Sequence, residues 1–166
     1  MIGRRQRGFT LLEMMVVLGV ITILALMAAP SLQELAVRDQ INNALPLADI
    51  AKTPVALAWA IAQSFPTDNA AAALPSADKI VNNYVSSVAV QEGAIHITFG
   101  NRANGLIKDK ILTLRPAVVA DAPIVPVTWV CGTAEAPNKM TINGANKTNI
   151  PVNFLPLSCR ARSVKN

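Results

Sequence analysis

The stretch GFTLLEMMVVLGVITILALMAAPSL, residues 8–32, decides the fold because it is an almost wholly apolar run. From Leu11 to Leu32 its only charged side chain is that of Glu13. About 20 consecutive apolar residues span the hydrocarbon core of a bilayer as an α-helix. We therefore expect the chain to be anchored in a membrane by this N-terminal segment.

Basic side chains gather immediately before the apolar run. Arg4, Arg5 and Arg7 lie within the first eight residues; without them 12 basic and 10 acidic side chains remain, so the formal charge falls from +5 to +2. A nearly balanced domain gives little reason to expect a nucleic-acid partner. Basic residues beside a membrane segment keep that flank cytoplasmic, so we expect everything after Leu32 on the outer side of the inner membrane.

The helical pattern continues beyond the apolar run and becomes one-sided. Apolar residues recur mostly three or four positions apart, with polar residues between them: Val37, Ile41, Leu45, Ala48, Val55, Trp59 and Ala62. This spacing predicts an amphipathic helix with one buried stripe. One helix is expected from about Phe9 to about Ala62, with kinks or local unwinding at Pro30, Pro46 and Pro54, because proline removes a backbone donor.

Four β-prone runs follow the helix: Tyr84–Val90, Ala94–Phe99, Leu106–Leu114 and Val125–Cys131. The first two are predicted to form a hairpin, since only three residues separate them. Ser76 is expected to cap a short helical turn over residues 79–83. His96 alternates with Ile95 and Ile97, and we expect it to face solvent.

The only two cysteines, Cys131 and Cys159, enclose a turn-rich C-terminal region. On the oxidising side of the membrane they fit a single disulfide. It would close a loop of about 30 residues and stabilise the fold by about 3–4 kcal/mol in the chain-entropy model. Free thiols or metal ligands are the alternatives, but a zinc site is disfavoured because the chain has one histidine and no paired-cysteine spacing.

The segment Gly8-Phe9-Thr10-Leu11-Leu12-Glu13, followed by the apolar residues 14–30, resembles the processing and assembly motif of type IV pilins. The resemblance implies that a prepilin peptidase cleaves between Gly8 and Phe9 on the cytoplasmic face and methylates the new amine, giving N-methylphenylalanine at Phe9. It also implies a helix kink at Pro30. The residues around Cys131 and Cys159 resemble the disulfide-bounded C-terminal loop of type IVa pilins.

Glu13 needs a physical reason to lie in an apolar helix. An ionised carboxylate in the hydrocarbon region is costly unless it is paired or protonated. Cleavage would create a positive charge on the Phe9 amine, so Glu13 of one subunit can accept a charge-assisted hydrogen bond from Phe9 of its neighbour. We expect this pairing to set the axial register of a filament. The alternative is that Glu13 lies near the membrane surface, snorkels into water and does nothing more.

The fold class implied by the resemblance is α+β, the pilin fold. A long, kinked N-terminal helix would pack on a four-stranded antiparallel sheet, and the disulfide-bounded C-terminal loop would close the domain. Residues 1–8 would be a cleaved leader, residues 9–32 the transmembrane and filament-core half of the helix, and residues 33–166 the periplasmic globular domain.

The function implied by the resemblance is that of a structural subunit of a type IV pilus used for adhesion, twitching motility or DNA uptake. The chain would cross the inner membrane once before assembly and be extracellular afterwards. Its partners would be other copies of itself, the prepilin peptidase, the platform protein and the assembly ATPase. No phosphate-binding loop, nucleophile elbow or carboxylate pair is visible, so we expect no enzymatic activity, cofactor or metal.

Other functions share some of these features. A minor pilin would prime or cap the filament, a type II secretion pseudopilin has a similar helix, and a membrane-anchored periplasmic binding domain would not polymerise. An ordinary secretory signal cut after Ala29 is disfavoured by Pro30 directly after that site and by Glu13. Asn146-Lys147-Thr148 matches a glycosylation sequon, a tripeptide that is common by chance.

Overall fold

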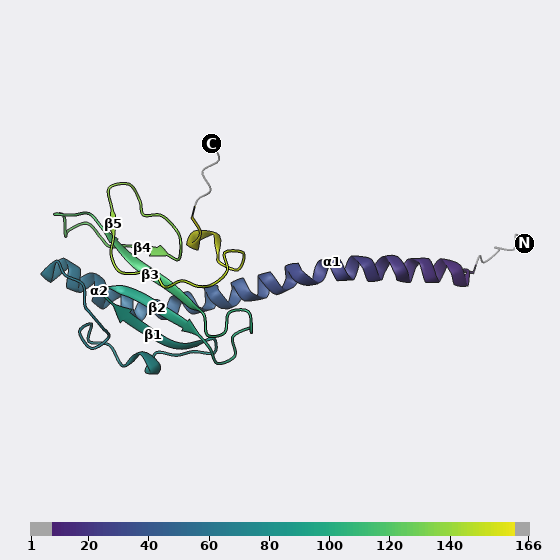
Figure 1. The fold of residues 1–166 in the computed structure, drawn as a ribbon, viewed down its shortest axis with the longest axis horizontal. Coiled ribbons are helices and arrows are strands. Elements are labelled where there is room, and N and C mark those ends of the chain that lie inside the picture. The colour runs from purple at the N-terminus through teal and green to yellow at the C-terminus, as the bar shows by residue number, and fades with distance from the viewer. Residues whose placement is uncertain (1–7, 162–166) are drawn as a thin grey trace, which may run out of the picture. The chain divides into compact units, whose positions relative to one another are not determined.

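The structure is a computed structural model that describes residues 8–161, without the side chains of residues 28–31 (Figure 1). The chain divides into two compact units, Met1–Leu35 and Ala36–Asn166. Apart from Gly8, the predicted leader lies outside the described residues.

Three consecutive helical elements form the N-terminal part of the chain: α1 (Leu11–Ala44), the 3-10 turn η1 (Leu45–Ala48) and α2 (Asp49–Ala62). Local unwinding was predicted at Pro46 and is confirmed by η1. Pro54 lies inside α2 and does not end it. The carbonyl that loses its donor there belongs to Ile50, which is exposed, so water can replace the lost bond. The kink at Pro30 stays a prediction.

The predicted buried stripe is confirmed from Val37 to Val55 and keeps its helical spacing of three or four residues through η1. Six residues of the stripe are fully buried: Val37, Ile41, Ala44, Ala48, Ala51 and Val55. Leu45 and Trp59 are only partly buried and Ala62 is exposed, contrary to the prediction. Trp59 instead stacks on Phe65, with ring centroids 5.0 Å apart.

The sheet is antiparallel with strand order β1-β2-β3-β4 and confirms the predicted four strands. Their bounds are β1 Val85–Gln91, β2 Ala94–Phe99, β3 Ile111–Val118 and β4 Thr128–Cys131. A two-residue strand, β5 (Thr141–Ile142), pairs with β3 and was not predicted. The inner face of the sheet supplies Ile95, Ile97, Phe99, Leu112 and Leu114 to the same hydrophobic core as the buried stripe.

The third strand was predicted over Leu106–Leu114 and in fact begins at Ile111. Residues 104–110 form turns instead, in which Asn104 O accepts hydrogen bonds from the backbone N–H groups of both Ile107 and Lys108, at 2.9 Å each. The strand then continues through Pro116, whose carbonyl accepts from the backbone N–H of Asn143 at 2.8 Å.

The helical turn predicted over residues 79–83 is also misplaced. A 3-10 turn, η2, spans Ala77–Lys79, and Ser76 makes no side-chain capping hydrogen bond to it. Residues 81–84 instead lead into β1, where the Asn82 side chain accepts from the N–H groups of Tyr84 and Val85, both at 2.8 Å. The asparagine therefore organises a turn where the sequence pattern indicated a helix.

His96 was predicted to face solvent, and this is wrong. As the alternation indicated, His96 lies on the face of β2 opposite to the core. Residues 143–149 cover this face, so His96 is only 4% exposed. Its Nδ1 lies 3.0 Å from Oγ1 of Thr113, which also accepts from the backbone N–H of Lys147 at 3.0 Å. Nearby, a Cβ on Gly144 would lie 2.6 Å from the Cβ of Ala94, so this cover needs a glycine there.

Burial and, secondly, the positive charge of Lys147 lower the pKa of His96 to about 4. The Thr113 hydroxyl accepts from Lys147, so its own proton can be donated to Nδ1 of a neutral imidazole. The ring proton then belongs on Nε2, which has no hydrogen-bond partner among the described residues. Protonation would place donors on both nitrogens and remove the acceptor that Thr113 uses.

We predict acid lability from His96. Its pKa is near 6.5 in the unfolded chain and about 4 in the folded one, so the unfolded state binds a proton more readily. The stabilising contribution of the neutral ring is complete above pH 6.5 and is lost as the pH falls toward 4, by up to about 3 kcal/mol. Urea unfolding of the detergent-solubilised chain at pH 7 and pH 4 measures this loss. His96→Gln should show a smaller loss than the parent; identical losses would contradict the assignment.

Candidate assembly and processing segment

The start of α1 is built by a side-chain cap. Thr10 immediately precedes the first helical residue, and its Oγ1 accepts a hydrogen bond from the backbone N–H of Glu13 at 3.2 Å. Thr10-Leu11-Leu12-Glu13 therefore has the sequence and half of the bonding of a capping box. Glu13 is thereby fixed in the first turn of α1, where the helix dipole favours a negative charge.

This local role of Glu13 was missed in the sequence, although Thr-x-x-Glu before an apolar run is a readable signal for it. The predicted filament role concerns a different part of the residue. The cap uses the backbone N–H of Glu13, whereas the carboxylate forms no ion pair within the described part of the chain. Phe9, 76% exposed, has a peptide nitrogen here rather than an amine.

The apolar helix has no cover within its own unit. All described side chains from Leu11 to Met27 are exposed. The hydroxyl of Thr22 donates to the carbonyl of Leu18 at 2.8 Å, so this polar group is satisfied without water. Among the described residues one helix, Leu11–Ala62, has the length and composition to cross a membrane. A helix that is apolar on every side is stable only when lipid or other protein surrounds it.

The predicted disulfide is confirmed. Cys131 and Cys159 are bonded, with their Cα atoms 4.5 Å apart, so neither is a free thiol or metal ligand. Beside it, Gly132 has a positive φ of 57°, and a Cβ there would lie 2.6 Å from the carbonyl oxygen of Cys159. The bond thus joins β4 to η3 (Leu157–Cys159) and closes what we call the C-terminal loop, residues 132–158.

Two arginines hold the C-terminal loop at one backbone atom. Arg38, on the part of α1 that belongs to the second unit, donates to Asn153 O from Nε at 3.1 Å and from Nη2 at 2.7 Å. Arg160 donates to the same oxygen at 3.0 Å and to Leu155 O at 2.8 Å. Because hydrogen bonds from charged donors are stronger than neutral ones, this arrangement fixes the loop next to the helix. No pattern in the sequence indicates this contact.

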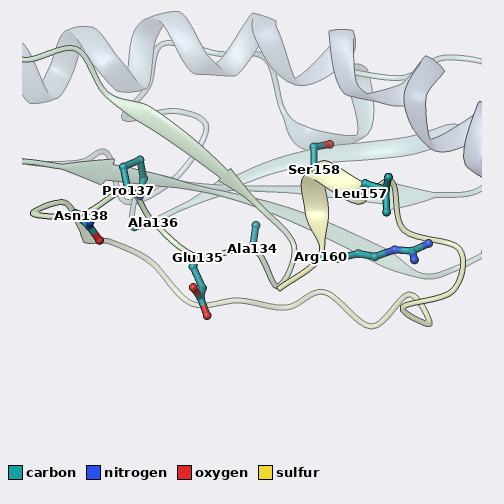
Figure 2. A pocket seen from close by; sticks show the side chains of 8 residues that line it. All are labelled: Ala134, Glu135, Ala136, Pro137, Asn138, Leu157, Ser158 and Arg160. Atoms are coloured by element: carbon teal, nitrogen blue, oxygen red, sulfur yellow. The ribbon is translucent and has the colours of Figure 1, made fainter. Parts of the chain in front are cut away.

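A hollow of about 610 Å³ lies in the C-terminal loop (Figure 2). It is lined by residues 134–138 and by Leu157, Ser158 and Arg160. Figure 2 shows that the side chains of Glu135 and Arg160 project in different directions, so polar groups do not converge as they do in a small-molecule site. No group of three metal-ligating side chains occurs in the part of the chain that the structure describes.

The side chains of Asn146 and Thr148, in the sequon Asn146-Lys147-Thr148, form hydrogen bonds within the domain. Nδ2 of Asn146 donates to the carbonyl of Gly132 at 2.9 Å, and Oδ1 accepts from the backbone N–H of Thr148 at 3.0 Å. The hydroxyl of Thr148 accepts from the backbone N–H of Thr113 at 3.0 Å. An amide engaged on both sides is a poor acceptor for a glycan in the folded chain.

Comparison with known proteins agrees with this architecture. Residues 37–160 match the family described as Pilin (bacterial filament), and residues 3–29 match the prokaryotic N-terminal methylation motif. The chain is 32% identical over 164 residues to a fimbrial protein of Neisseria meningitidis serogroup A, covering 93% of this chain and 94% of the relative. It is 32% identical over 161 residues to the type IV major pilin protein PilE of Neisseria gonorrhoeae, with the same coverage.

A fimbrial protein of Eikenella corrodens, EcpC, is also 32% identical, over 165 residues that cover 96% of this chain and 94% of the relative. The fold and the N-terminal motif define a subunit of a bacterial surface filament. The chain belongs to the pilin family and is a structural subunit of a pilus. These matches do not favour a pseudopilin or a binding domain that never polymerises.

Proposed function

We propose that the chain is made as a type IV prepilin, cut between Gly8 and Phe9, methylated on the Phe9 amine and polymerised through its N-terminal helix. The observation that carries this proposal is the capped start of α1, which places the carboxylate of Glu13 one turn from the proposed cut and with no ion pair to any described residue. The match of residues 3–29 to the methylation motif supports the same cut and modification.

The orientation and the partners follow from the same segment. Arg4, Arg5 and Arg7 keep the leader in the cytoplasm, so residues 9–32 cross the inner membrane and residues 33–166 lie in the periplasm. A prepilin peptidase would act at the cytoplasmic surface, and an assembly platform and ATPase would draw the processed subunit from the membrane. A kink at Pro30 would let the helix bend between its two halves.

Removal of the leader supplies the charge that Glu13 lacks. An unpaired carboxylate is costly among apolar helices. The new amine of Phe9 on a neighbouring copy is a cation that an axial offset of about one helical turn would bring to the level of Glu13. Their charge-assisted hydrogen bond would fix one axial offset between adjacent subunits. Cleavage thereby becomes a condition for assembly.

Several relatives are named type IV major pilin proteins, and we propose the same abundant role for this chain. Adhesion, twitching motility or DNA uptake would be the output of the filament rather than of any single subunit. We infer no catalytic role.

Mass spectrometry of filaments sheared from cells tests the processing step. The expected N-terminal residue is Phe9, carrying one additional methyl group, and the chain should be the main component of the filament. The full leader still present in sheared filaments, or a mature start at Pro30 or Ser31, would contradict the proposal.

The pairing of Glu13 is tested by a matched set of variants. Glu13→Gln keeps the size of the side chain and its backbone N–H but removes the charge, so we expect surface filaments to fall at least tenfold. Thr10→Ala removes the cap at a cost of about 1 kcal/mol in helix stability but keeps the carboxylate, so filaments should persist. Pilin in the sheared and membrane fractions is measured by immunoblot. Normal filament amounts from Glu13→Gln would refute the pairing.

A further inference from the structure

The second unit carries an apolar helix surface with no cover. From residue 53 to its end, α2 has no charged side chain. Its buried side presents Ala51 and Val55 to the core, yet Leu57 and Ile61 on the opposite side are 56% and 76% exposed. A helix that is apolar on both sides is expected to have a partner on both sides.

A groove runs along the flank of this surface. It has a volume of about 460 Å³ and lies between α2 and the loop that connects β3 to β4. Its helix wall is formed by Thr53, Ala56, Leu57, Trp59 and Ala60, and residues 123–127 form the other wall. At its rim Ile124 is 93% exposed. No charged residue lines the groove, so its surface suits an apolar occupant.

A second exposed apolar surface lies on the C-terminal loop. Val152 and Leu157 are 55% and 81% exposed. Between them, Asn153 is bound by Arg38, so this surface lies beside the start of the helix in the second unit. The groove lies beside residues 53–60, which are about 20–30 Å further along the helical elements at 1.5 Å per residue. The two apolar surfaces are thus at opposite ends of the same unit (Figure 1).

We propose that the groove and Ile124 of one copy receive the C-terminal loop surface, Val152 and Leu157, of the next copy in the filament. A filament requires a heterologous contact, in which two different surfaces meet and the contact repeats without closing. The groove and the loop surface both carry exposed apolar side chains and lie at opposite ends of one unit, so they meet this requirement. The inference rests on the polymerisation of the family and not on the pairing of Glu13.

Photo-crosslinking in intact filaments tests this contact. A benzophenone-bearing phenylalanine analogue is incorporated at position 124, where high exposure makes misfolding of the subunit a minor concern. After irradiation, sheared filaments should contain cross-linked dimers whose joined peptides link position 124 to residues 151–160 of another copy. The reciprocal analogue at position 157 should cross-link to residues 49–62 or 118–127. The same analogue at Val81, which is exposed elsewhere on the unit, is the matched control and should give neither product.

Each other outcome has a defined meaning. Cross-links from position 124 to residues 9–32 would assign the groove to the N-terminal helix of a neighbour and overturn the proposal. Cross-links to a different protein, or none in filaments that form normally, would also overturn it while leaving the pilus function intact. Failure of the unsubstituted chain to enter any filament would instead contradict the proposed function.

Discussion

An apolar helix without a partner in its own unit is the constraint on which the rest of this structure depends. The described side chains from Leu11 to Met27 are all exposed, and the one hydroxyl in the middle of the run is satisfied by the helix itself. Such a segment can lie in lipid or among copies of itself, and moving between the two exchanges one apolar environment for another. The small net change in hydrophobic free energy suits a subunit that leaves a membrane to join a polymer.

The second unit has a different requirement from the apolar helix, because it must be stable in water. It therefore needs a hydrophobic core of its own. The buried stripe from Val37 to Val55 is covered by the inner face of the sheet. The outer face is covered by residues 143–149, which are held by Thr113 rather than by an apolar core. The disulfide and the Arg38 contact to Asn153 fix the remainder of the C-terminal loop. Hydrogen bonds and one disulfide, rather than a second hydrophobic core, therefore hold the segments that cover the outer face of the sheet.

The parts of this fold that the sequence could predict are those governed by local periodicity. The apolar run, the buried stripe, the hairpin of β1 and β2, and the single disulfide all follow from spacing or composition. The solvent-facing prediction for His96 failed because residues 143–149 lie far from it in sequence, and their contacts are side chain to backbone with no periodic pattern. Strand β5 was not predicted for the same reason: it has two residues, too few for a periodic pattern, and its partner β3 is distant in sequence. In the candidate site, the cap of Thr10 on Glu13 was not predicted, although the Thr-x-x-Glu spacing before an apolar run indicates it.

The most direct test of the central claim is an electron cryo-microscopy reconstruction of filaments sheared from cells, at a resolution that shows side chains. We expect the helices beginning at Phe9 to be bundled at the filament axis, with the carboxylate of Glu13 within hydrogen-bonding distance of the Phe9 amine of an adjacent copy. A map in which Glu13 faces solvent or a basic side chain of its own copy, with the neighbouring amine elsewhere, would contradict the claim that this ion pair sets the register.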